Sequence, residues 1–210
     1  MIIGKGITVE ILKLKGGNVI IDGDAAVNTI QNAEGFTGKT YIIQKGTLTN
    51  SPSVNNIIVV SNESEMALRL AAENGGDVTL TEDIVLNEPI VIASGKTVTL
   101  NLDGKTISQE KACTASYEMI ANNGTLTIKG NGKISFKDTS AGDPSFGWGS
   151  YTIRNNGNLT IENGTIEHLG QQEFATHMIC AVFQYSGSTT IKDGITSTPN
   201  YRSARLWHGK

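Results

Sequence analysis

The sequence predicts an all-β protein whose main part is a right-handed single-stranded parallel β-helix, with an N-terminal capping helix and a small N-terminal β appendix. Three observations lead to this prediction. The composition favours turns and short strands, with 24 glycines and only 6% aromatic residues in 210. A motif of two short strands joined by a glycine turn recurs along the chain. One segment alone has the pattern of a helix, and it stands before the repeats.

The repeated unit starts at a glycine and contains two short strands separated by a second glycine. Its copies start at Gly95, Gly124, Gly157 and Gly187, at spacings of 29, 33 and 30 residues. A third short strand precedes each starting glycine. Apolar positions recur in three columns, which are Leu100, Ile128, Ile161 and Ile191; then Ile107, Ile134, Ile166 and Ile195; then Val91, Ile120, Ile153 and Phe183.

One unit has too few apolar residues to bury a core by itself, so the units must stack on one another. Stacking places equivalent apolar residues in line and pairs each strand with its counterpart one unit further on. Asn123 and Asn156 occupy the same turn position, which predicts an asparagine ladder. The alternative is that the Asn-Gly pairs form hairpin turns in a β-sandwich.

Residues 1–60 do not fit the repeated unit. Short strands around Gly16 and Gly17 and a linker-like stretch at 51–56 predict a separate β appendix over residues 1–60. The β-helix is expected over residues 61–210, with repeating units from residue 77. Another unit would begin near Gly209, so the solenoid is expected to be unfinished at its C-terminal end.

The segment 61–76 is predicted to be a helix that covers the open end of the solenoid. Ser61 or Asn62 is suited to cap its first turn, and Asn74 followed by glycine is suited to end it. Its apolar stripe is expected to consist of Met66, Ala67 and Leu70.

The stretch "GGDVTLTEDIVLNEPIVIASGKTVTLNLDGKTI", which follows the helix, together with units such as "NNGNLTIENGTI", resembles pectin-lyase-like β-helix proteins, as found in bacteriophage fibre or appendage proteins and in bacterial adhesin-like surface repeats. The resemblance covers about residues 61–200. It implies the fold but not the function, because that architecture carries lyases, hydrolases, adhesins and inert stalks. It also implies a homotrimer, because fibres of this kind are commonly trimers.

Charge and hydropathy exclude several classes of partner. The net charge of −3 and the lack of a basic run argue against nucleic acid. No apolar stretch has the length of a secretory signal or a membrane span, so neither membrane association nor secretion is expected. Cys113 and Cys180 lie far apart, and free buried thiols are expected.

The sequence predicts no catalytic residue, metal site or cofactor. The acidic residues considered were Asp103, Asp138, Asp143, Glu162, Glu167 and Asp193. Pectate lyases, which the fold resembles, use clustered carboxylates with calcium and a basic residue, but no arginine accompanies this set, so solvated turn residues are expected. His168, His177 and His208 lack the spacing of a metal set.

The candidate site is a corner where extra residues enter between the third strand of one unit and the first strand of the next. The enlarged segments are 108–118, 137–151 and 167–178, and insertions at one corner build one surface. This surface is expected to contact another subunit or a glycan; otherwise its aromatic residues cover the flank of the solenoid. The residues are Tyr117, Phe146, Trp148, Tyr151, Phe174 and His177.

These observations favour a non-enzymatic structural protein of a bacteriophage virion, a head or tail fibre or appendage. It would be made in the host cytoplasm, dock to capsid or tail proteins through residues 1–60, and use the β-helix for contact with host-surface glycans or neighbouring subunits. The alternatives are a polysaccharide lyase or hydrolase of the phage depolymerase type and a bacterial surface adhesin.

Overall fold

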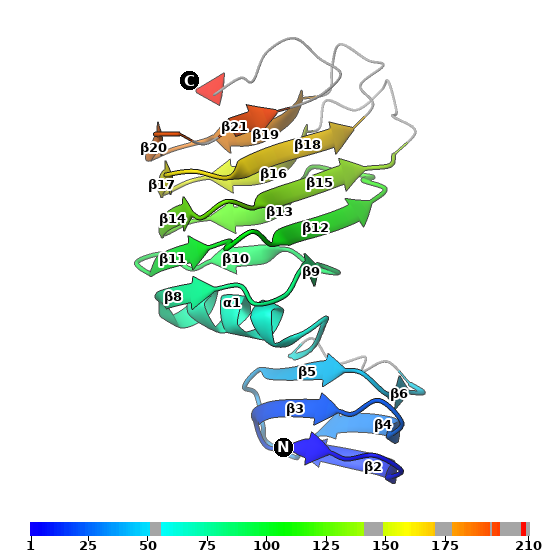
Figure 1. Cartoon of the computed structure of the whole chain (residues 1–210). Helices are drawn as coiled ribbons and strands as arrows, with labels where there is room; N and C mark the ends of the chain where they lie inside the picture. The colour runs from blue at the N-terminus through cyan, green and yellow to red at the C-terminus, as the bar shows by residue number, and fades with distance from the viewer. Residues whose placement is uncertain (51–55, 141–148, 171–177, 194, 198–206, 209–210) are drawn as a thin grey trace. The chain divides into compact units, whose positions relative to one another are not determined.

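The structure is a computed structural model, and it describes residues 1–50, 56–140, 149–170, 178–193, 195–197 and 207–208. The chain divides into two compact units, residues 1–66 and residues 67–210. Strands dominate both units, and every strand pair in the described residues is parallel (Figure 1). The fold is therefore mostly β, as predicted.

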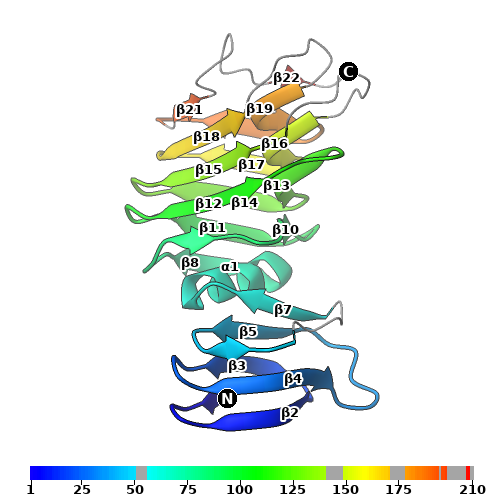
Figure 2. The same cartoon turned by 90° about the vertical axis from the view of Figure 1, so that its right-hand side faces the viewer.

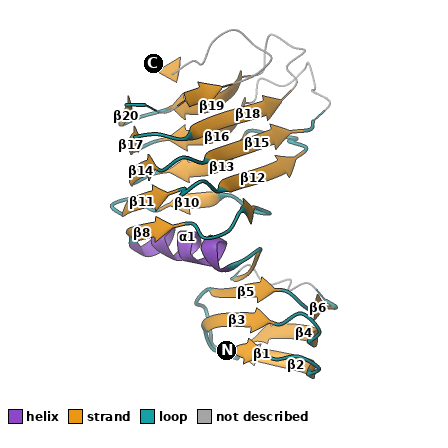
Figure 3. Cartoon of the chain, viewed as in Figure 1, coloured by secondary structure: helices purple, strands orange, loops and turns teal. Residues whose placement is uncertain are grey.

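The N-terminal unit contains two parallel sheets, which Figure 3 shows as orange strands. One sheet has the order β1 (Ile2–Ile3), β3 (Gly17–Ile21), β5 (Thr40–Gln44) and β7 (Ile57–Val60), and the other has the order β2 (Thr8–Leu14), β4 (Ala26–Asn32) and β6 (Thr47–Leu48). Strands from the two sheets alternate along the sequence of this unit, from β1 to β7.

Residues 1–60 do not share the spacing of the C-terminal units, but their strands stack as well. Ile20 pairs with Ile2 on one side and with Ile43 on the other, so strands also stack here, at spacings of 18 and 23 residues. The repeat in residues 1–60 was not recognised in the sequence, because its spacing is shorter than that of the C-terminal units and its turns lack the Asn-Gly motif.

The helix α1 spans Glu63–Asn74. Asn62 Oδ1 accepts a hydrogen bond from the Glu65 backbone N–H at 3.0 Å and so caps the helix, and Glu65 Oε2 accepts one from the Ser61 backbone N–H at 2.7 Å. After Asn74, Gly75 has a φ of 87°, which favours glycine and ends the helix.

The buried face of α1 differs from the predicted one. Leu68, Ala71 and Ala72 pack into the main core, whereas Ala67 is exposed. Met66 and Leu70 are only partly buried, so the predicted stripe was wrong. The Ala93 backbone N–H donates to Ala72 O at 2.9 Å, which ties the helix to the first units of the stack.

The C-terminal unit builds three parallel sheets, because consecutive strands belong to different sheets and each pairs with its counterpart three strands later. Figure 2 shows these strands stacked in successive levels. Sheet I contains β8 (Gly76–Thr79), β11 (Thr97–Asn101), β14 (Thr125–Lys129), β17 (Asn158–Ile161) and β20 (Ser188–Ile191). Sheet II contains β9 (Ile84–Val85), β12 (Thr106–Lys111), β15 (Lys133–Asp138), β18 (Thr165–Gly170) and β21 (Ile195–Ser197). Sheet III contains β10 (Ile90–Ile92), β13 (Tyr117–Asn122), β16 (Gly149–Asn155), β19 (Met178–Gln184) and β22 (Trp207–His208).

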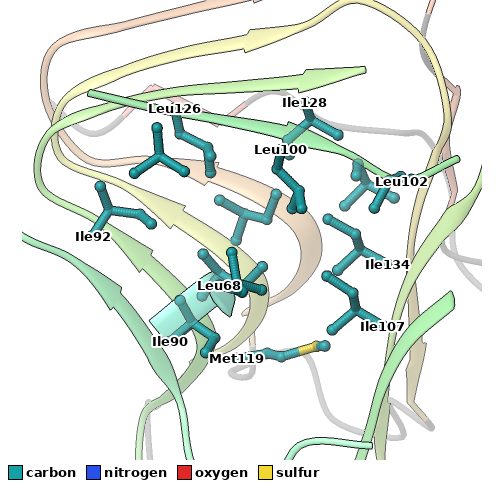
Figure 4. Packing of buried hydrophobic residues seen from close by; sticks show 14 of the residues in the cluster. Leu68, Ile90, Ile92, Leu100, Leu102, Ile107, Met119, Leu126, Ile128 and Ile134 are labelled. Carbon is teal, nitrogen blue, oxygen red and sulfur yellow. The ribbon is translucent and has the colours of Figure 1, made fainter. Parts of the chain in front are cut away.

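The three sheets enclose one apolar core (Figure 4). Leu100 pairs in register with Ile128, and Ile128 pairs with Ile161, as the repeat predicts. Ile191 continues this column in register. Its side chain is nevertheless 39% exposed, because β20 is the last strand of sheet I.

The other two columns are confirmed in their central members, because Ile107, Ile134 and Ile166 pair in register and so do Ile120 and Ile153. Their terminal members were predicted one residue out of register. In sheet III, Ile120 pairs with Ile90 and Ile153 pairs with Val182, in place of the expected Val91 and Phe183. In sheet II, Ile166 pairs with Thr196 instead of Ile195. A slip of one residue turns a side chain to the other face of its sheet. Val91 is accordingly 51% exposed.

The predicted asparagine ladder is present. Asn156 Nδ2 donates to Asn123 Oδ1 at 2.7 Å. A second, buried ladder lies beside it, in which Asn122 donates to Asn155 Oδ1 at 2.7 Å and Asn155 donates to Gln184 Oε1 at 2.9 Å. These amides satisfy one another inside the turn, so the ladder fixes the axial register of sheet III.

Candidate contact surface

A second apolar cluster lies apart from the main core, on sheet III. It consists of Tyr151 on β16 with Cys180 and Phe183 on β19. The rings of Tyr151 and Phe183 stack, with centroids 4.6 Å apart and planes at 14°. The ring of Tyr185 follows at 6.3 Å from that of Phe183. We call Tyr151, Phe183 and Tyr185 the outer aromatic patch.

Arg154 borders the outer aromatic patch. Its guanidinium carbon lies 4.8 Å from the centroid of the Tyr185 ring, which is a cation–π contact. One guanidinium nitrogen lies 3.5 Å from Glu118 Oε1. Tyr185 is 58% exposed, so the patch presents an aromatic ring to solvent beside a cation and an anion.

A break in strand alternation brings Tyr151 and Arg154 to this patch. Thr152 and Ile153 are consecutive and both fully buried, although alternate residues of a regular strand face opposite sides. The register with β13 and with β19 omits the Thr152 position. The bend therefore lets residues three apart contact the same aromatic cluster.

Only two of the predicted site residues belong to the described chain. Tyr117 packs against the main core, where its ring lies 5.5 Å from that of Phe136. Tyr151 belongs instead to the outer aromatic patch, so the structure places the two tyrosines in different clusters. The remaining predicted residues lie outside the described residues; they are Phe146, Trp148, Phe174 and His177.

Burial shifts the pKa of the phenol of both tyrosines. It raises the pKa of Tyr117 to about 12, and the Lys111 ammonium lies 5.0 Å above the ring of that tyrosine. Burial also raises the pKa of Tyr151. Both phenols are therefore neutral at physiological pH, and the two rings serve as packing groups.

Sequence reasoning missed Phe183, Tyr185 and Arg154. Phe183 was placed in the core column because its position was shifted by one residue. The structural feature that separates Phe183 from the core is the step at Thr152–Ile153, where two consecutive residues are both buried.

The segments that join sheet II to sheet III do enter at one corner, as predicted. They connect β12 to β13, β15 to β16 and β18 to β19. Residues 141–148 and 171–177 lie outside the described residues. The surface that these insertions build is therefore still a prediction.

Ser150, His168 and Asp138 lie close to the ends of the strands that these segments join. Ser150 Oγ lies 3.0 Å from His168 Nε2. Asp138 Oδ1 accepts backbone N–H bonds from Ser140 at 2.9 Å and from Cys113 at 3.4 Å. Ser150, His168 and Asp138 are buried, with at most 6% of each residue exposed.

This group lacks the order of a hydrolytic triad. In a triad the aspartate orients the histidine, whereas here the nitrogen that would face it, His168 Nδ1, has no hydrogen-bond partner among the described residues. Burial lowers the pKa of His168 to about 4. Burial alone would raise the pKa of Asp138, but hydrogen bonds from Ser140, Ser150 and Cys113 lower it overall. The group is a buried polar network with a neutral imidazole and an ionised carboxylate.

The other acidic candidates have local roles. Glu162 forms a 3.0 Å ion pair with Lys192, and Glu167 forms a 3.2 Å ion pair with Lys133. Asp103 adopts a φ of 47° in a turn. Asp143 lies outside the described residues.

The two cysteines are free and buried, as predicted. Burial raises the pKa of each thiol to about 12. Within the described ranges, no three histidine, cysteine, aspartate or glutamate side chains are grouped closely enough to hold a metal ion. No helix in the same residues has the length and apolar character needed to cross a membrane.

Comparison with known proteins adds no relative. The sequence matches no family model, and it matches neither a curated protein nor a solved structure.

Proposed function

We propose that this chain is a non-enzymatic structural protein of a bacteriophage virion, a fibre or appendage of the head or tail. Its C-terminal unit forms a right-handed parallel β-helix that serves as a stalk. Residues 1–60 dock to a capsid or tail protein. The outer aromatic patch contacts a neighbouring subunit or a glycan of the host surface.

The connections between strands support the right-handed sense of the proposed β-helix. Every pair of neighbouring strands in the three sheets is parallel and is joined by a crossover through the other two sheets. Crossovers between parallel strands of one sheet are right-handed in nearly all proteins, because the twist of the strands favours that path. A right-handed crossover repeated in each unit would generate the right-handed solenoid that we propose.

The observation that carries the proposal is the continuous register along the stack. Strands pair with their counterparts over successive units, and the amide ladder of Asn122, Asn155 and Gln184 runs inside one turn. Such a stack is an elongated element whose stability adds from unit to unit. Such an element suits a structural stalk.

The outer aromatic patch supports a contact role. An exposed tyrosine ring stacks on sugars or fills a pocket of a protein partner, and the adjacent Arg154 supplies hydrogen-bond donors. Arg154 already contacts both Tyr185 and Glu118, which holds its guanidinium in one place. A preorganised side chain loses less freedom on binding.

The enzyme alternative receives less support from the described acids. Glu162 and Glu167 are each paired with a lysine, and Asp138 is buried. A lyase or hydrolase needs an acid or base within reach of its substrate. Release of reducing sugar or of an unsaturated product from host capsule by the purified chain would favour the enzyme.

Immunolabelling of virions tests the proposal. Particles of the phage that carries this gene are purified through two density gradients and labelled with antibody raised against the full chain. We expect label at discrete sites on the head or tail, and the protein in the particle band. Protein found only in the soluble fraction of the lysate would contradict the virion role, and it would leave the fold unaffected.

A further inference from the structure

Asparagine followed by glycine occurs five times in the chain, and all five pairs lie within the described residues. In such a pair the side-chain amide carbon of asparagine is close to the backbone nitrogen of the next residue. Glycine has no Cβ, so that nitrogen is open to reaction. The pairs are Asn74-Gly75, Asn123-Gly124, Asn131-Gly132, Asn156-Gly157 and Asn163-Gly164.

Two of the pairs are held by the asparagine ladders. The Gly124 backbone N–H donates to Asn122 Oδ1 at 3.2 Å, and the Gly157 backbone N–H donates to Asn155 Oδ1 at 3.2 Å. The side-chain amides of these two pairs also bond to each other at 2.7 Å. Both the glycine nitrogen and the asparagine amide must therefore leave a hydrogen bond before they can react with each other.

The pair at the end of α1 is held in the same way. The Gly75 backbone N–H donates to Ala71 O at 2.7 Å. Asn74 Nδ2 donates to Leu70 O at 3.0 Å. The C-terminal turn of the helix thus occupies both reacting groups.

The pair Asn131-Gly132 differs from these three. It lies in the turn between β14 and β15, and Asn131 is exposed. Among the described residues, neither its side chain nor the peptide group that joins it to Gly132 forms a hydrogen bond. That peptide group is therefore not held in one orientation, and the amide carbon has access to the glycine nitrogen.

The fifth pair is enclosed by neighbouring atoms. The Gly164 backbone N–H also lacks a hydrogen bond among the described residues. Asn163 Oδ1, however, is buried without a partner in the same part of the chain. The amide of Asn163 must leave this packing before it can react, whereas that of Asn131 is already in solvent.

We propose that Asn131 is a site of self-modification, at which the chain converts its own asparagine to aspartate and isoaspartate. The backbone nitrogen of Gly132 attacks Cγ of Asn131 and forms a new C–N bond. The side-chain nitrogen leaves as ammonia and takes the proton of the Gly132 N–H. Water then adds across one of the two C–N bonds of the resulting cyclic imide.

The two ways of opening the imide have different consequences for the stack. Opening at Cγ gives aspartate, and opening at the main-chain carbonyl gives isoaspartate, which adds one carbon to the main chain. The adjoining strand is fixed on both sides, because the Lys133 N–H donates to Lys105 O at 3.0 Å and the Thr165 N–H donates to Gly132 O at 2.9 Å. Isoaspartate therefore lengthens a turn whose following strand is held in register. Both products add a negative charge. The inference does not depend on the virion role.

Peptide mapping of the aged protein tests the proposal. The purified full chain is incubated in mildly alkaline buffer made with heavy-oxygen water, so that each product formed during the incubation carries the label. We expect Asn131 to react about tenfold or more faster than Asn74, Asn123 and Asn156, because each of those requires at least one hydrogen bond to break first. Asn163 should also react more slowly than Asn131.

Unfolding and substitution supply the controls. In urea the five pairs should react at similar rates, because the differences come from the folded structure. Asn131→Gln should abolish the labelled product at this position, since glutamine would have to close a larger ring, and circular dichroism checks that this variant is folded. A rate at Asn131 no higher than at any other pair in the folded chain, or the same ranking of rates in urea, would overturn the proposal.

Discussion

Asn155→Ala should strongly destabilise the C-terminal unit, because Asn155 is the middle of the buried amide ladder. Its Nδ2 group donates to Gln184 Oε1 at 2.9 Å and to Ser188 O at 2.8 Å. Its Oδ1 atom accepts from Asn122 Nδ2 at 2.7 Å and from the Gly157 backbone N–H at 3.2 Å. Alanine removes these four bonds and a fifth, from Nδ2 to Thr189 Oγ1 at 3.0 Å. The side chain is fully buried, so water does not readily replace them.

The loss of stability in Asn155→Ala follows from the buried polar groups that the substitution leaves without a hydrogen-bond partner. A buried polar group that loses its partner costs about 1–3 kcal/mol. Some of the partner groups keep another bond, as Asn122 Nδ2 does to Asn158 O at 3.1 Å. We therefore expect a loss of about 3–5 kcal/mol, a large part of the stability of an ordinary domain.

Asn156→Ala is the matched control, because Asn156 is the next residue and belongs to the other ladder. Its Nδ2 donates to Asn123 at 2.7 Å, but the side chain is only partly buried, so water can take the place of the bond. A loss below about 1 kcal/mol is expected. Urea unfolding followed by circular dichroism compares the two variants. Equal losses would refute the assignment of the buried ladder as the stabilising one.

Three further predictions concern the core of the C-terminal unit. Burial lowers the pKa of His168 from 6.5 to about 4, so the folded chain binds fewer protons than the unfolded chain between these two pH values. The free energy of unfolding should therefore fall by up to roughly 3 kcal/mol as the pH drops from 6.5 to 4. In urea titrations, His168→Gln should remove this pH dependence. Ile161→Asp buries an unpaired carboxylate and should unfold the unit, whereas the outward-facing Thr160→Lys should change stability by less than about 0.5 kcal/mol in thermal melts. Because burial raises the thiol pKa of Cys113 and Cys180 to about 12, both should resist iodoacetamide at pH 8 until the chain is unfolded, as mass spectrometry would report.

The repeat and its central column could be predicted because they depend on local pattern. Leu100, Ile128 and Ile161 each follow a turn at a fixed offset, so the alternation of strand residues determines which face they occupy. The stack of parallel strands followed from the shortage of apolar residues in each unit, since neighbouring units must complete the core.

The errors arose where alternation is broken. The step from Thr152 to Ile153 places two consecutive residues inside, and apolar residues on either side of such a step look equivalent in the sequence. Phe183 was therefore placed in the core, although it stacks on Tyr151 in a separate cluster. Composition also gave no means of recognising the shorter repeat of the N-terminal unit.

The contact surface was predicted less well than the fold. Tyr151 could be associated with a surface cluster because aromatic residues are scarce in this chain. Arg154 and Tyr185 were missed because their contact depends on the register between β16 and β19. Contacts of this kind depend on the exact register between strands of neighbouring units. The sequence pattern predicts that register only with an error of about one residue.

Disulfide formation between engineered cysteines tests the parallel stack most directly. Thr127 and Thr160 are register partners on β14 and β17, so Thr127→Cys/Thr160→Cys should form an intramolecular disulfide in the folded chain under mild oxidation. Thr127→Cys/Asn158→Cys should not, because Asn158 lies two residues out of register, about 8 Å from Thr127, beyond the span of a disulfide. Non-reducing peptide mapping reads both results. Failure of the first pair, or equal yields from the two pairs, would contradict the stack on which the proposed stalk depends.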